Sequence, residues 1–293
     1  MKIRRIIVTF ALHLNQKNMS KAKVLFVSQE MEPYTGDGHL SHVSRHLPQS
    51  TQERGKEIRT FMPRYGSINE RRYQLHEVIR LSGMNQIIDD SDHPLIIKVA
   101  SIQAARMQVY FIDNEEYFQR KTIFRDLRGK FHKDNDERMI FFCRGVLETV
   151  KKLGWAPDII HCHGWMTSLM PYYLKKVYND DPVFANTRVV YSVYDEGFTE
   201  TLDKRLSVKL EAGEDFAEQV KVLDDPTFDN LNQFAIEMAD GVIAGSETIK
   251  AVTEKAMQQT DKMILGYQPV ETYADAYSDF YDELLESNPV LAS

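Results

Sequence analysis

Residues 157–169 read PDIIHCHGWMTSL, and this stretch decides the fold. The apolar run from Ile159 to Cys162 predicts a short buried strand. A tight polar turn at His163 and Gly164 follows it, and an amphipathic helix is expected after the turn. Because ligands in an open α/β sheet bind at the carboxyl ends of the strands, we expect chemistry at this turn.

Strand-like runs alternate with helical segments along the rest of the chain. Strands are expected at residues 24–28, 58–62, 107–112, 159–162, 189–193 and 241–244, with a hairpin-like excursion at 75–81 and 95–100. Helices are expected at 41–53 and 135–153, where apolar residues recur at half-buried helical spacing. The alternation predicts the α/β fold class, with a single Rossmann-like, doubly wound parallel sheet covered by helices on both faces.

Composition excludes several classes of protein. The 293 residues carry a formal net charge of −7, whereas a nucleic-acid partner requires a clustered basic face. The apolar runs are much shorter than the roughly 18 residues of a membrane span. The two cysteines, Cys143 and Cys162, make no disulfide framework and suit a reducing compartment, so we expect a cytoplasmic protein.

The two ends of the chain differ from its middle. We expect an N-terminal extension over residues 1–20, the α/β domain over 21–268, and an acidic C-terminal helix and tail over 269–293. The start is basic and then briefly apolar, which leaves a weak export signal or an extra surface strand as alternatives to an upstream extension. The helix from Tyr273 to Leu285 has an aromatic stripe and an acidic face. It is predicted to pack on its own domain, and a docking helix for another chain is the alternative.

The opening stretch resembles the PDVVHxHDWH signature of bacterial glycogen synthases and plant starch synthases. Segments at 57–66, 110–120, 134–142 and 239–246 are similar to further family motifs in the same order, so the resemblance runs from about Lys23 to Thr248. It implies the N-terminal half of a GT-B glycosyltransferase. The family reaction that it implies is glucosyl transfer from ADP-glucose to an α-1,4-glucan.

Several anchor positions of the family are changed in this chain. The lysine of the family's KTGGL loop, which meets the phosphate charge, aligns with Gly36, and the next residue is Asp37, whose carboxylate repels a pyrophosphate. The aspartate of HDWH becomes Gly164, and a gapless alignment places Tyr191 at the histidine of the TVHNxxYQG loop. We therefore expect no catalytic residue at these degenerate positions and predict that the isolated chain is inactive.

Residues that keep family positions, or lie beside them, are candidate substrate contacts. They are Gly38, His39, His42, His161, His163, Trp165 and Glu196. Aromatic rings such as Trp165 suit the apolar faces of glucose, although core packing explains that tryptophan equally well. His39, His42 and His46 follow at i, i+3 and i+7, which indicates an anion or sugar contact or else a solvated helix face.

Acidic residues stand in two of the loops expected at strand ends. Glu30 and Glu32 lie in one loop, and Asp195 and Glu196 in another. They work as an acid/base pair only if the fold brings them within several ångströms of each other, and solvated loop residues are the alternative. A sugar hydrolase unrelated to the synthases is a further alternative, but the sequence contains no nucleophile motif that supports it.

The run His161-Cys162-His163 does not predict a zinc site. Adjacent strand residues point to opposite faces, so the two histidines share a face that Cys162 does not. No other histidine or cysteine pair has ligand spacing. We therefore expect no metal and no cofactor.

Two functions follow from these patterns. The first is a glycogen- or starch-synthase-like glycosyltransferase that acts only with a second chain, because the resemblance places the nucleotide sugar on a further domain and this chain ends about 45 residues after the similar region. The second is a catalytically silent protein that binds an α-glucan or regulates a partner. Neither nucleic acid nor membrane is expected as a partner.

Overall fold

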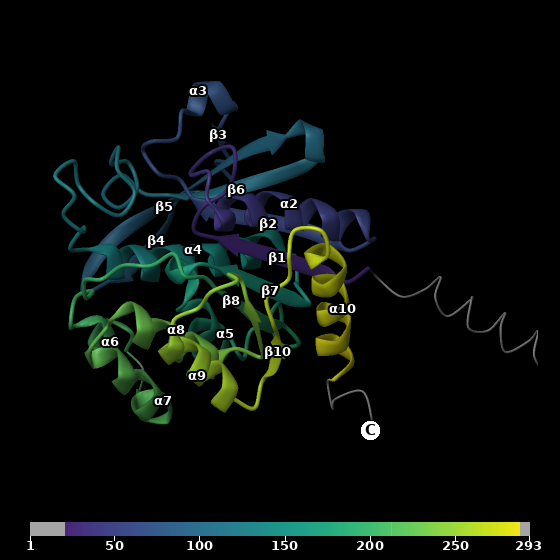
Figure 1. Cartoon of the computed structure of the whole chain (residues 1–293). Helices are drawn as coiled ribbons and strands as arrows, with labels where there is room; N and C mark the ends of the chain where they lie inside the picture. The colour runs from purple at the N-terminus through teal and green to yellow at the C-terminus, as the bar shows by residue number, and fades with distance from the viewer. Residues whose placement is uncertain (1–20, 212, 288–293) are drawn as a thin grey trace, which may run out of the picture.

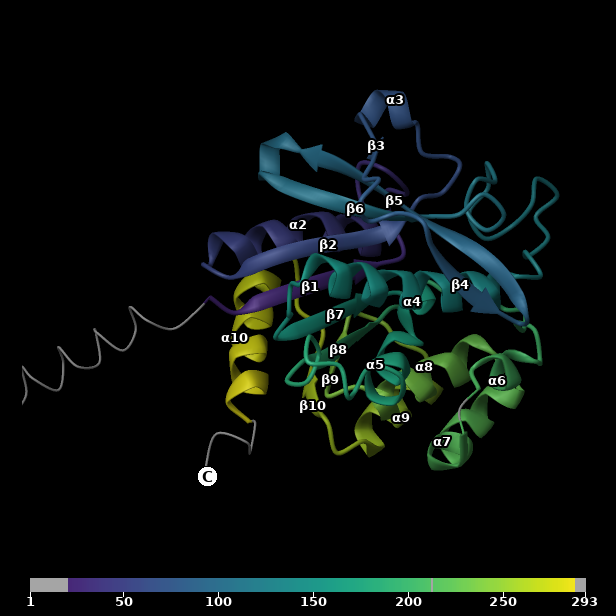
Figure 2. The same cartoon turned by 180° about the vertical axis from the view of Figure 1, so that it is seen from behind.

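The computed structural model describes residues 21–211 and 213–287, and Figure 1 shows the path of the chain. Residues 1–20 and 288–293 lie outside this part, and with them the predicted extension and the end of the predicted tail. A ten-stranded sheet runs through the described residues, with helices on both faces (Figures 1 and 2). This arrangement confirms the predicted α/β fold class.

The strands follow the order β10-β9-β8-β7-β1-β2-β6-β5-β3, and β4 pairs with β5. Their bounds are β1 Lys23–Ser28, β2 Glu57–Pro63, β3 His76–Glu77, β4 Met84–Ile88, β5 Ser91–Ile102, β6 Met107–Asp113, β7 Ile159–His163, β8 Arg188–Val193, β9 Gly241–Ala244 and β10 Met263–Leu265. From β10 to β6 every neighbouring pair is parallel. The strands of a parallel sheet are apolar on both faces, and helices must therefore pack on both faces to bury them.

The far edge of the sheet is antiparallel, which the sequence predicted only in part. β5 pairs with β6, with β4 and with the two-residue strand β3. The predicted pairing of 75–81 with 95–100 is found at β3, and Val78 N donates to Ile97 O at 2.8 Å just beyond it. The tight hairpin itself joins β4 to β5, which was not predicted from the sequence. Asp89 and Asp90 turn this hairpin with φ angles of 47° and 63°. The turn is missed because it lacks the usual Asn-Gly signal.

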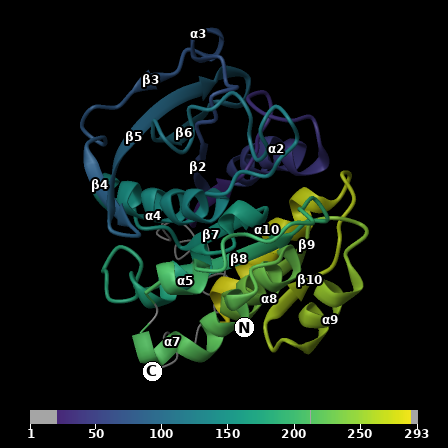
Figure 3. The same cartoon turned by 90° about the vertical axis from the view of Figure 1, so that its left-hand side faces the viewer.

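Helices cover both faces of the sheet (Figure 3). Their bounds are α2 His39–Glu53, α3 Glu70–Tyr73, α4 Asn135–Leu153, α5 Met170–Lys176, α6 Leu206–Lys209, α7 Gly213–Val220, α8 Phe228–Met238, α9 Ala251–Gln259 and α10 Tyr273–Glu286, with 3-10 turns at Gln103–Ala105, Trp165–Thr167 and Lys221–Asp224. Helices α2 and α10 pack over Val24 and Phe26 of β1, whereas α4, α5 and α8 join the larger core cluster on the other face. Within the described residues no helix combines the length and the apolar character needed to cross a membrane.

The last helix, α10, lies against the sheet beside α2 (Figure 1). Its buried side chains are Tyr273, Tyr277, Ser278, Phe280, Tyr281 and Leu284. On its polar side, Lys56 Nζ donates hydrogen bonds to Ser278 Oγ and to Asp282 Oδ2, each at 2.9 Å. The prediction that this helix packs on its own domain is confirmed.

Candidate functional site

Loops from separate strands meet at the carboxyl edge of the sheet. Glu30 Oε2 lies 2.6 Å from the point where a Cβ on Gly36 would stand. Glu196, which follows β8, accepts a hydrogen bond from Leu40 N at 3.3 Å. Its Oε1 lies 3.4 Å from the corresponding point on Gly38. Two carboxylates therefore flank the turn between β1 and α2. We name Glu30, Gly36, Gly38, His39 and Glu196 the carboxyl-edge cluster.

Glu30 is the half-buried acid of this cluster. Burial raises the pKa of Glu30 from its ordinary 4.5 to about 7, and the neighbouring Glu196 carboxylate adds to the rise. A carboxyl group that titrates near pH 7 both donates and accepts a proton at neutral pH, which is the behaviour of a general acid or base. The fold thus brings together two acids that the sequence places in separate loops.

His39, the first residue of α2, connects this helix to the loop after β9. Its Nε2 donates to the carbonyl oxygen of Gly245, which follows β9, at 2.9 Å. A Cβ at Gly245 would stand 2.8 Å from the ring of Tyr194, so only glycine allows this close approach. Tyr194 is 3% exposed. The Tyr194 ring is therefore part of the core, where it packs against Gly245. It has no exposed face on which a sugar could stack.

Gly164, which stands at the family aspartate, is packed against Gln29. Its φ is +86°, and a Cβ there would stand 2.4 Å from Gln29 Oε1. Gln29 is buried and accepts a hydrogen bond from Met166 N at 3.3 Å. An aspartate cannot occupy position 164 unless Gln29 moves. No pattern in the sequence pointed to Gln29, because its contacts with Gly164 and Met166 arise only in the folded chain.

The two histidines of the opening stretch lie in the core and not in the carboxyl-edge cluster. His161 Nδ1 is 2.6 Å from the hydroxyl of Tyr281, and its Nε2 is 2.7 Å from Ser192 Oγ. His163 Nδ1 is 2.8 Å from the hydroxyl of Tyr194. Burial lowers the pKa of His161 well below its usual value and that of His163 to about 3. Both are therefore neutral, hydrogen-bonded residues on the face that α10 covers.

Two more predicted positions lie in the core. The Tyr191 hydroxyl donates to Asn232 Oδ1 at 2.8 Å. Tyr191 lies within β8, as the strand predicted at 189–193 requires, and the first residue beyond the strand is Tyr194. Trp165 is 3% exposed and packs on Phe124 with 4.8 Å between ring centroids, which is core packing.

His42, another predicted contact, lies outside the carboxyl-edge cluster. Its Nδ1 is 3.4 Å from Glu32 Oε2, and His46 Nε2 is 3.9 Å from the same oxygen. The predicted row of three histidines is therefore divided, with His39 at the edge and the other two beside Glu32. Among the residues that the structure describes, Glu32, His42 and His46 are a set that could hold a metal ion.

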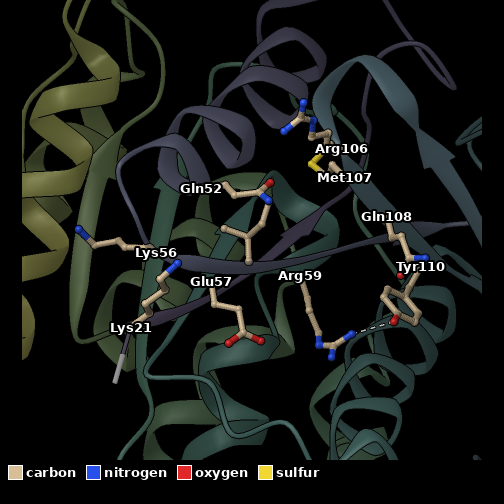
Figure 4. A pocket seen from close by; sticks show the side chains of 10 residues that line it. Lys21, Gln52, Lys56, Glu57, Arg59, Arg106, Met107, Gln108 and Tyr110 are labelled. Carbon is tan, nitrogen blue, oxygen red and sulfur yellow. Dashed lines mark hydrogen bonds between the residues drawn. The ribbon is translucent and has the colours of Figure 1, made fainter. Parts of the chain in front are cut away.

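A separate hollow opens at the opposite, amino-terminal edge of the sheet (Figure 4). This cavity of about 530 Å³ is lined in part by Lys56, Arg59 and Arg106. Lys56 pairs with Asp282, and Arg59 donates to the hydroxyl of Tyr110 at 2.8 Å, so these two cations already have partners. Ligands of open α/β sheets bind at the other edge, and the carboxyl-edge cluster is the better candidate site.

Comparison with known protein families shows to which family this chain belongs. Residues 23–264 match the family described as the starch synthase catalytic domain. The chain belongs to the starch synthase catalytic domain family. Glycogen synthases of Chlorobium limicola and Chlorobium luteolum are each 42% identical to it over 173 residues, which are 59% of this chain and 35% of theirs. This member of the family spans about a third of the length of the curated relatives it matches.

A solved member of the starch synthase group has the same fold. The catalytic domain of starch synthase IV from Arabidopsis thaliana, bound to ADP and acarbose, superposes with a TM-score of 0.66 at 21% identity. The match covers 84% of this chain and 51% of that chain. The chain thus has the architecture of one half of a GT-B glycosyltransferase, as the opening stretch and the alternation of its elements predicted.

Proposed function

We propose that this member of the starch synthase catalytic domain family binds an α-glucan at its carboxyl edge and does not itself transfer glucose from ADP-glucose. The observation that carries the proposal is the approach of the Glu30 carboxylate to Gly36. The family motif has a lysine at this position. A carboxylate thus stands at the turn where a cation would meet the phosphates.

The charge at this turn disfavours a nucleotide sugar. Asp37 and Glu196 are exposed carboxylates, and Glu30 is a third acid that is half-buried. A phosphate at the turn meets negative charge where a cation would stabilise it. A lysine at Gly36 would also be strained, because its Cβ would stand 2.6 Å from Glu30 Oε2 and the backbone has a φ of +63°.

A neutral glucan does not suffer this repulsion. Carboxylate oxygens accept hydrogen bonds from sugar hydroxyls, and Glu196 presents such oxygens at the surface of the edge. The curated relatives are named glycogen synthases, and the solved relative is described with ADP and acarbose. Binding of an acceptor glucan is therefore the property that we infer this chain to keep.

A second candidate function is a glycosyltransferase that works with another chain. The observation that favours it is the pKa of Glu30, which burial raises to about 7 and which suits a general acid or base. In this case a partner supplies the nucleotide-sugar site, and transfer begins only when the partner is present. The buried free thiols of Cys143 and Cys162 suit the reducing cytoplasm, where we place either function.

Native electrophoresis through gels that contain glycogen tests the glucan site. We expect glycogen to retard the wild-type chain. The Glu196→Gln variant should bind roughly 10-fold more weakly or worse, because a hydrogen bond to a charged group contributes about 1.5–3 kcal/mol. Glu283→Gln, which removes an exposed charge of α10, is the matched control and should migrate like the wild type. Equal retardation of both variants, or no retardation of the wild type, contradicts the proposed site.

A further inference from the structure

Three ligand-type side chains meet where the loop after β1 passes α2. Glu32 comes from the loop, and His42 and His46 stand one turn apart on the helix. Glu32 Oε2 lies 3.4 Å from His42 Nδ1 and 3.9 Å from His46 Nε2. The two imidazole rings lie 4.2 Å apart between centroids. One ligand atom from each residue falls within 4.8 Å of the other two.

These separations fit a small transition-metal ion. Zinc binds histidine nitrogen and carboxylate oxygen at about 2.0–2.2 Å, so neighbouring ligand atoms of a tetrahedral site stand roughly 3.3–3.5 Å apart. The contact of His42 with Glu32, at 3.4 Å, already has this spacing, and that of His46, at 3.9 Å, needs a shift of a few tenths of an ångström. Two imidazoles and one carboxylate suit zinc and its neighbours, whereas calcium and magnesium prefer oxygen ligands alone.

The three side chains lie at the surface, where an ion from solution can reach them. The side chains of Glu32, His42 and His46 are 30%, 40% and 42% exposed, so solvent reaches all three. Arg45, the neighbouring cation, donates from Nη1 to Gln49 Oε1 at 3.0 Å.

We propose that Glu32, His42 and His46 form a binding site for a divalent transition metal of the zinc class, with three protein ligands and a fourth position open to water. The metal would join the loop that carries Glu30 to helix α2. The proposal departs from the expectation of no metal. The prediction that no other histidine pair has ligand spacing is wrong, because His42 and His46 stand at i and i+4 and their ring nitrogens lie close together. The third ligand could not be foreseen, since Glu32 reaches the helix only through the fold.

The full chain, stripped of metal by chelator and dialysis, provides the test. Calorimetric titration with zinc chloride should show one saturable site per chain, and cobalt chloride should give the visible absorption of tetrahedral cobalt. The variants His42→Ala, His46→Ala and Glu32→Gln should each weaken zinc binding by at least about 10-fold. His76→Ala, which removes an exposed histidine far along the chain from this site, is the control and should bind as the wild type does.

Thermal unfolding with and without zinc separates a lost site from a damaged fold. Without metal, the variants should melt near the wild-type temperature, since the three side chains are partly exposed. Zinc should raise the melting temperature of the wild type and of His76→Ala but not that of the double variant His42→Gln/His46→Gln. A double variant that binds zinc as tightly as the wild type, or a wild type that shows no saturable binding, overturns the proposal. Neither outcome bears on the glycogen gel, so the two proposals fail separately.

Discussion

The hydroxyl of Tyr281 lies 2.6 Å from Nδ1 of His161, and this contact joins the last helix to a central strand of the sheet. Ser192 Oγ occupies the other ring nitrogen at 2.7 Å. Burial lowers the pKa of His161, so the ring is neutral and both of its nitrogens are used inside the core. A histidine of the family signature therefore serves in this chain to hold α10 against the sheet.

Loss of the Tyr281 hydroxyl should destabilise the fold. In Tyr281→Phe, the buried Nδ1 of His161 loses its partner, which costs about 1–3 kcal/mol. Urea unfolding followed by circular dichroism at neutral pH measures the free energy of unfolding. Asp279→Asn, an exposed change on the same helix, should leave it unaltered. If Tyr281→Phe is as stable as the wild type, the hydrogen bond does not hold the helix.

Titration of Glu30 should make stability depend on pH. Burial raises the pKa of Glu30 from 4.5 in the ordinary case to about 7, so between these values the folded chain keeps a proton that the unfolded chain has released. Its contribution to stability is complete below pH 4.5 and is lost as the pH rises through about 7. The variant Glu30→Gln stays neutral throughout, and its advantage over the wild type should grow across this window by on the order of 3 kcal/mol.

The measurement is the free energy of unfolding of wild type and Glu30→Gln at a series of pH values. The difference between the two isolates Glu30 from Asp136, whose pKa burial also raises, to about 6. In a Glu196→Gln background the growth should be smaller, because the carboxylate that helps to raise the pKa is gone. A difference that stays constant with pH shows that Glu30 titrates normally.

Restoring the family aspartate at Gly164 should fail unless Gln29 is changed as well. Gly164→Asp places a side chain on a backbone with φ of +86° and drives its Cβ to within 2.4 Å of Gln29 Oε1. Strain of this kind costs about 1–3 kcal/mol before the collision is counted. In a double-mutant cycle with Gln29→Ala, thermal unfolding should show a favourable coupling of about 0.5–3 kcal/mol. Simple additivity of the two changes would exclude the contact as the cause.

A buried ion pair at the start of α4 should be sensitive to loss of its cation. Lys209 Nζ is 2.7 Å from both Asp136 Oδ2 and Glu137 Oε1, and its side chain is 2% exposed. Lys209→Met leaves Asp136 buried without a counter-ion, which should cost about 3–5 kcal/mol. Because burial raises the pKa of Asp136 to about 6, the loss should shrink once the pH falls below that value. Lys204→Met, an exposed change, is the control, and an equal effect of both variants would contradict the role of the pair.

Much of the fold follows from local patterns. The apolar spacing over 135–153 predicted α4 with its observed bounds, and Gly154 ends that helix in a left-handed conformation with φ of +59°. The run at 241–244 predicted β9 in the same way. The strand β4 was missed because its turn has positive φ angles at two aspartates, Asp89 and Asp90, and lacks the glycine of the usual Asn-Gly or Asp-Gly signal.

The candidate site was less predictable, because its contacts join distant parts of the chain. Glu30 and Glu196 stand in loops that only the order of the strands brings to one edge. His161 was assigned to the site from the family signature. In the structure its imidazole ring is buried in the core, where its Nδ1 lies within hydrogen-bond distance of the hydroxyl of Tyr281 on the last helix. Periodicity in a sequence reports which face of an element is buried, and it does not report what covers that face.

The most direct test of the proposed function is transfer of labelled glucose from ADP-glucose to glycogen by the purified chain. The exposed carboxylates of Asp37 and Glu196 put negative charge where the phosphates would lie. Glu30, 2.6 Å from the site of a Cβ on Gly36, takes the space of the family lysine. We predict that the chain incorporates no more label than a blank without protein, although glycogen retards it in the native gel. Sustained incorporation that disappears in Glu30→Gln would contradict this account and would assign Glu30 to catalysis.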